Sequence, residues 1–130
     1  MTIMVMAIAI IGIVGIRASG ERLLGKAHVE RTAAGASQAA ATELAEIYFE
    51  WQLARYDDDQ RERRPLAALM SDAATLERAR AAANEIAAVN ALGRASDVKV
   101  TCDAHGVIVT VTIGRQEAQS DFPAPECFPR

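Results

Sequence analysis

Hydrophobic and polar positions divide the chain into an apolar N-terminal segment and a long region of helical character. Residues 1–16 contain no charged side chain, and almost all of them are apolar. We expect a transmembrane or assembly helix over residues 1–20, although residues 2–16 span only about 22 Å and a hydrocarbon core is about 30 Å thick. The side chains expected in contact with the membrane are Ile3, Val5, Ile8, Ile10, Ile11, Ile13, Val14 and Ile16.

Two other interpretations of this segment stay open. A cleaved signal peptide suits its length, and residues 18–20 (Ala-Ser-Gly) resemble a cleavage site, but a basic stretch before the apolar run is missing. A buried core helix would need apolar neighbours on every side. The orientation signals conflict, because Arg17, Arg22 and Lys26 favour a cytoplasmic head, whereas a cysteine pair favours a head outside the cytoplasm. We expect a single-pass protein of the cell membrane with the head outside the cytoplasm.

Residues 21–56 predict an alanine-rich helix without proline, in which alanine, leucine and glutamate are strong helix formers. Small residues recur three and four positions apart and form a stripe that another helix could approach closely. This helix-packing stripe consists of Ala33, Ser37, Ala40 and Leu44. The apolar segment can run unbroken into this helix and form a rod of about 75 Å.

An acidic run, Asp57–Asp59, ends the alanine-rich helix, because carboxylates are unfavourable at the negative end of the helix dipole. Residues 57–70 are interpreted as a charged linker with a short turn at Leu66–Met70. The acidic run lacks the alternating ligands, the glycine and the distant glutamate of an EF-hand. We therefore expect a solvated turn there and no metal site.

A second helix is expected after the linker. Ser71 or Asp72 is a suitable N-cap, and residues 90–93 contain a C-terminal stop signal. The apolar face of this helix comprises Leu76, Ala79, Ala83, Ile86 and Ala87.

The period then changes from helical to alternating. Residues 98–102 and 107–113 flank a turn at residues 103–106 and predict an antiparallel β-hairpin. Within it, one face carries Val98, Val100 and Cys102, and another carries Val107, Val109, Val111 and Ile113. The expected fold class is α+β, with a long N-terminal helix, a second helix and a C-terminal hairpin or small sheet.

The C-terminal residues 115–130 include Pro123, Pro125 and Pro129, and are interpreted as an extended, irregular tail. The chain has two cysteines, and an export-like N-terminus favours a single disulfide between Cys102 and Cys127. The expected organisation is an apolar helix (1–20), an alanine-rich helix (21–56), a linker (57–70), a helix plus hairpin head (71–114) and the tail.

Composition and motifs argue against catalysis. The net charge of −3 disfavours a general nucleic-acid surface. His28 and His105 are far apart and lack cysteines at metal-ligand spacing. The arginines at positions 61, 63 and 64 are neutralised by acidic neighbours. We expect no enzyme, no cofactor, no metal, no nucleic acid and no small-molecule substrate.

The order of elements resembles a known family. The stretch E-R-L-L at residues 21–24 precedes the alanine-rich residues 28–41, and residues 81–90 form a helical segment before the valine-rich residues 98–102 and 107–111. This order is similar to that of the TadE/TadG-like proteins, the minor pseudopilins of tight-adherence (Flp-type) pilus systems.

The resemblance implies a non-catalytic, envelope-anchored minor subunit that supports pilus assembly and can enter an extracellular fibre. Its implied partners are membrane lipid and other pilin-like or secretion-system subunits. Two alternatives stay open: a membrane-anchored partner-binding protein of another envelope complex, which would use the helix-packing stripe for docking, and a secreted small binding domain.

Overall fold

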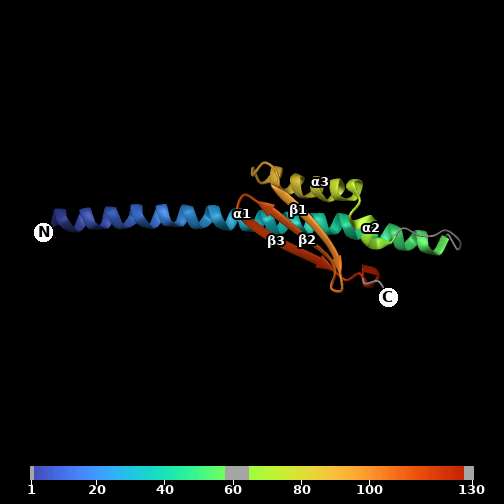
Figure 1. Ribbon diagram of the computed structural model, residues 1–130. Coiled ribbons are helices and arrows are strands. Elements are labelled where there is room, and N and C mark those ends of the chain that lie inside the picture. Colours follow the sequence, from blue (N-terminus) through green and yellow to red (C-terminus); the bar gives the residue numbers. More distant parts are fainter. Residues whose placement is uncertain (1, 58–64, 128–130) are drawn as a thin grey trace.

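The computed structural model describes the backbone of residues 2–57 and 65–127, and the side chains of residues 25–54 and 65–127. Its elements form an α+β fold, as expected from the sequence (Figure 1). In chain order they are α1 (Thr2–Asp57), α2 (Leu66–Met70), α3 (Ala73–Val89), β1 (Asp97–Asp103), β2 (Gly106–Ile113), β3 (Gln116–Phe122) and the 3-10 turn η1 (Pro125–Cys127).

Helix α1 is one continuous helix of 56 residues, about 84 Å long at 1.5 Å per residue. Its N-terminal part projects from the molecule, and its C-terminal half carries α3 and the sheet (Figure 1). The expected rod is therefore present, and the backbone shows no break at the proposed boundary between residues 20 and 21. Alanine, leucine and glutamate maintain the helix across its glycines.

Within residues 25–54 and 65–127, whose side chains are described, no helical stretch is long and apolar enough to cross a bilayer. The apolar residues 2–16 lie outside that part of the chain, since only their backbone is described. The membrane contacts expected for their aliphatic side chains stay a prediction.

Helix α3 packs antiparallel to α1. Arg78, near the start of α3, donates to Glu43 at 2.6 Å, and Nε2 of His28 lies 3.0 Å from the carbonyl oxygen of Asn90 at the other end. The α3 side of the contact is made of alanines, and Ala79, Ala83 and Ala87 are fully buried. Alanine leaves room for the two backbones to approach, so the thin apolar face predicted for this helix is its packing face.

The end of α3 matches the predicted stop signal. Asp72 is the N-cap residue and Asn90 the C-cap residue. Ala91 has a positive φ of 58°, and the N–H of Leu92 donates to the carbonyl of Ala87 at 2.9 Å. This is the Schellman arrangement, in which a left-handed residue ends the helix and its final carbonyls are capped.

The sheet is antiparallel in the order β1-β2-β3, and one face packs on α1. The hairpin predicted for residues 98–113 is confirmed as β1 and β2. The register pairs Val98 with Val111 and Val100 with Val109. The two apolar sets that we assigned to separate faces therefore share one face, because directly paired residues project to the same side of a sheet.

The third strand corrects the prediction of an irregular tail. Residues 116–122 pair with β2 through a two-residue turn at Gly114 and Arg115. Gly114 has a φ of 60°, which a glycine adopts without strain in such a hairpin turn. β3 lacks β-branched residues, so its own sequence favours a strand only weakly. β3 is a strand because it pairs with the backbone groups of β2 and packs on α1 beneath the sheet. Residues 128–130 of the tail lie outside the described part.

Of the predicted linker at residues 57–70, the structure describes the backbone of Asp57 and residues 65–70. The short turn expected at Leu66–Met70 is helix α2, and Leu66 and Met70 are buried under the sheet and η1. The acidic and basic residues from 58 to 64 lie outside the described residues. The core that results combines alanines of the helices with valines of β2 and contains few large side chains.

Candidate functional site

The helix-packing stripe predicted on α1 is occupied by the chain itself. Ala33, Ser37, Ala40 and Leu44 are each exposed by 1 % or less. The Oγ atom of Ser37 lies 2.8 Å from Oγ of Ser120 on β3. The stripe does bring close neighbours to α1, but these neighbours are elements of the head. A partner cannot dock on the stripe unless the head opens.

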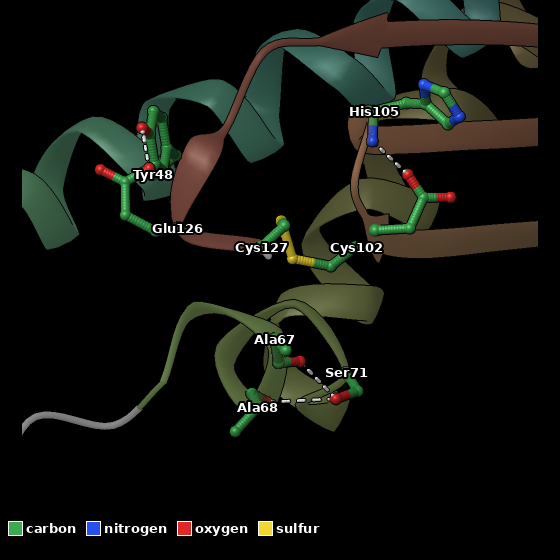
Figure 2. The surroundings of a disulfide bond; sticks show 9 residues. Tyr48, Ala67, Ala68, Ser71, Cys102, His105, Glu126 and Cys127 are labelled. Carbon is green, nitrogen blue, oxygen red and sulfur yellow. Dashed lines mark hydrogen bonds between the residues drawn. A yellow bond between two sulfur atoms is a disulfide. The ribbon is translucent and has the colours of Figure 1, made fainter. Parts of the chain in front are cut away.

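The expected disulfide joins Cys102 to Cys127 over a sequence separation of 25 residues (Figure 2). It ties the end of β1 to η1, and Cys127 is buried. A covalent link at this point holds the short proline-containing segment after β3 against the head. Such a bond persists in oxidising compartments and not in a reducing cytosol.

A second link holds the same segment to α1. The hydroxyl of Tyr48 donates to Oε2 of Glu126 at 2.6 Å (Figure 2), and Nε2 of Gln52 donates to the Tyr48 hydroxyl at 2.8 Å. The Tyr48 ring stacks on Trp51 and contacts Phe122, with centroid distances of 6.3 and 5.8 Å. Sequence reasoning missed Glu126, because 78 residues separate it from Tyr48 and neither position carries a motif.

The outward face of α1 carries a shallow groove beside β3. Its helix wall has short or polar side chains, and its other wall is the outer edge of the sheet. The groove has a volume of about 520 Å³. It is lined by Gln38, Ala41, Thr42, Ala45, Gln119, Ser120, Asp121 and Phe122. We call it the α1–β3 groove.

Two large apolar side chains continue the helix wall of the α1–β3 groove. Phe49 is 59 % exposed and Leu53 is 50 % exposed. They follow Thr42 and Ala45 at spacings of three and four residues, so all four residues lie on one helix face.

A second groove, of about 420 Å³, lies where α1, α2 and α3 meet. Ile47, Trp51 and Leu69 form its apolar part, and Glu50 and Asp72 lie at its rim with Arg78. Arg78 makes an ion pair with Glu43, so its charge is already partly compensated.

The two histidines that we considered as metal ligands lie on different elements, His28 on α1 and His105 in the β1–β2 turn. The backbone N–H of His105 donates to Oδ1 of Asp103 at 2.8 Å and closes the β1–β2 turn (Figure 2). His28 contacts the end of α3. In the described part of the chain, histidine, cysteine and acidic residues form no group of three or more that could hold a metal ion. The cluster at Arg61, Arg63 and Arg64 lies outside that part.

No protein-family model, curated protein or solved structure matches the chain. The geometry of the molecule is therefore the basis for assigning its function.

Proposed function

We propose that the protein is a non-catalytic, membrane-anchored minor pilin-like subunit of a pilus or secretion apparatus. The observation that carries this proposal is the single continuous helix α1. Its C-terminal half is built into the head, while its N-terminal part, with the apolar residues 2–16, projects from the molecule (Figure 1). One rigid element thus connects an apolar segment to a folded head.

The apolar segment needs an apolar environment that the head does not offer. Burial of apolar surface contributes about 25 cal/mol per Å², so a helix of isoleucines, valines and methionines gains from lipid or from neighbouring helices. Both environments suit a subunit that is stored in a membrane and later packed in a fibre. Because α1 is one continuous helix, the placement of the apolar segment also fixes the placement of the head. A flexible tether would leave the head free to move.

The head suits an extracytoplasmic location. The disulfide from Cys102 to Cys127 and the hydrogen bond from Tyr48 to Glu126 fasten its C-terminal segment at two points. A small core with many alanines gains less from burial than a core of large side chains, and a disulfide offsets this deficit. The proposed orientation places the head outside the cytoplasm.

Membrane association is tested by fractionating cells that express the full chain and extracting the membranes at alkaline pH. We expect the chain to stay in the membrane pellet. Ile8→Arg combined with Ile11→Arg should move most of it to the soluble fraction, since each arginine near the helix centre costs about 3 kcal/mol of insertion. Ala34→Arg combined with Gln38→Arg adds the same charge on exposed head positions and should leave the chain in the pellet.

Assembly is tested by purifying a tagged full chain from its native cells. Pilin-like subunits should co-purify with it, and the Ile8→Arg, Ile11→Arg variant should lose them. An intact mass without residues 1–20 would favour a secreted binding domain instead. A membrane-bound chain that co-purifies only with an unrelated envelope complex would support the partner-binding alternative. Free thiols at Cys102 and Cys127 in intact cells would contradict the proposed orientation.

A further inference from the structure

We infer that the outer edge of β3, together with the α1–β3 groove, binds an extended basic segment of a partner protein as an antiparallel fourth strand. This inference is independent of the pilin-like function proposed above. It rests on the hydrogen-bonding groups of the edge, on the shape of the groove and on the charges beside it.

The edge presents main-chain groups that the sheet does not use. β3 is the last strand in the order β1-β2-β3. The hairpin closes on the pair Ile113 and Gln116 through a two-residue turn, and hydrogen-bonded pairs then alternate along the ladder. The main-chain N–H and C=O groups of Glu117, Gln119 and Asp121 are consequently directed away from β2. An added strand would satisfy them, which is the general mode of β-strand addition.

The groove leaves room for the side chains of such a strand. A strand added beside β3 would project alternate side chains inward, over the face of α1 that includes Ala41, Thr42 and Ala45. These residues are short, and the hollow above them measures about 520 Å³. Small or medium apolar side chains fit there, and the exposed ring of Phe49 lies on the same helix face.

The other side chains of the added strand would project outward, where the edge is acidic. Glu117 and Asp121 are exposed on the outer face of β3, and Gln119 between them contacts Thr110 across the sheet at 3.3 Å. Arg115 lies in the turn before β3. In an antiparallel pair, residues opposite Glu117 and Asp121 share their face, so lysine or arginine there forms favourable cross-strand pairs.

The same charges disfavour a second copy of this chain as the occupant. Two β3 edges that pair antiparallel about Gln119 would place Glu117 of each copy opposite Asp121 of the other. Like charges directly opposite each other destabilise a sheet pair. The edge therefore selects a basic partner strand over self-association.

The test uses the full chain in detergent micelles and a fluorescent decapeptide of alternating lysine and valine, acetylated and amidated at its ends. Fluorescence anisotropy should report saturable binding. A peptide with glutamate in place of lysine should bind at least tenfold more weakly. Methylation of the lysine backbone nitrogens should cause a similar loss, because those N–H groups meet the edge. Methylation of the valine nitrogens should leave the affinity within twofold.

Variants of the chain locate the peptide. Glu117→Lys with Asp121→Lys, and separately Ala45→Trp, should each weaken binding at least tenfold. Their matched controls are Glu77→Lys with Glu85→Lys, and Ala81→Trp, all at exposed positions on α3 away from the groove, and these should change affinity less than twofold. An unchanged circular dichroism spectrum verifies that each variant is folded.

Three results would overturn the inference: no saturable binding of the lysine–valine peptide, equal affinity of the two methylated peptides, or equal losses in the variants and their controls. Loss confined to the valine-methylated peptide would overturn the antiparallel register. Because these measurements need neither a membrane nor a pilus, their outcome is separable from that of the fractionation and co-purification experiments.

Discussion

Ser37 on α1 and Ser120 on β3 share a hydrogen bond of 2.8 Å across 83 residues of sequence. The Ser37 hydroxyl also donates to the carbonyl of Ala34 at 2.8 Å, so the Ser120 hydroxyl is the donor to Ser37. Ser37 is buried and Ser120 half-buried. The contact fixes the position of β3 along the helix, in a region where most neighbouring side chains are small.

Replacement of this pair should show coupling. Ser37→Ala leaves the Ser120 hydroxyl without its partner and should lower the free energy of unfolding by about 1 kcal/mol. Ser37→Ala combined with Ser120→Ala should cost less than the sum of the single variants. The measurement is chemical denaturation of the head, followed by fluorescence of the single tryptophan, Trp51. Strict additivity would show that the two hydroxyls do not interact.

The close packing of α3 on α1 should not tolerate a larger side chain. Ala83 is fully buried, and Ala83→Leu should destabilise the head by about 1–3 kcal/mol, since overpacking displaces the helices. Ala81→Leu, on the exposed face of α3, should change the stability by less than about 0.5 kcal/mol. A tolerant Ala83 would contradict direct contact between the two helices.

Gly106 should be the least replaceable of the hairpin glycines. It has a φ of 107°, and a Cβ atom there would lie 2.3 Å from the carbonyl oxygen of Phe122. Gly106→Ala should therefore separate β3 from the turn and lower the thermal midpoint by several degrees. Gly114→Ala meets open space and carries only the strain of a positive φ, about 1 kcal/mol. We expect the first loss to exceed the second clearly when both variants are melted side by side.

The end of α3 offers a stabilising substitution. Ala91 adopts a left-handed conformation that costs an L-residue roughly 1 kcal/mol, so Ala91→Gly should raise the free energy of unfolding by about that amount. The same change at Ala81, inside α3, should lower it by about 1 kcal/mol. Equilibrium denaturation of both variants gives the comparison, and a destabilised Ala91→Gly would refute the Schellman assignment.

Loss of the disulfide should release the C-terminal segment. For a closed loop of about 25 residues, the chain-entropy model assigns about 3.5 kcal/mol to the bond between Cys102 and Cys127. Cys102→Ser with Cys127→Ser should lose most of this stability, and limited proteolysis should cut after β3 sooner than in the parent. Addition of a reductant should affect the parent chain and leave the double variant unchanged.

Alternation and helix propensity were sufficient to identify the main elements. The β-branched run at residues 107–113 predicts β2 because a pleated strand favours such side chains, and the small-residue stripe on α1 marks a surface that packs closely. The two cysteines indicated their bond. These features depend on local sequence, or on the only two cysteines of the chain. They can therefore be predicted without knowledge of the fold.

Three-dimensional contacts decided the rest. β3 is polar, so its own sequence does not specify a strand. Residues 116–122 become a strand because they pair with the backbone groups of β2 and pack on the helix beneath the sheet. The sequence around Ser37 does not indicate whether a partner or the chain's own sheet covers this residue. Its burial depends on which distant segment of the chain packs against α1, and that segment is β3. The sequence by itself determined the helices, the β1–β2 hairpin and the expected cysteine pair, because their patterns are local. The tertiary structure decided that residues 116–122 form an edge strand and that the helix-packing stripe is internal, because both depend on contacts between distant segments.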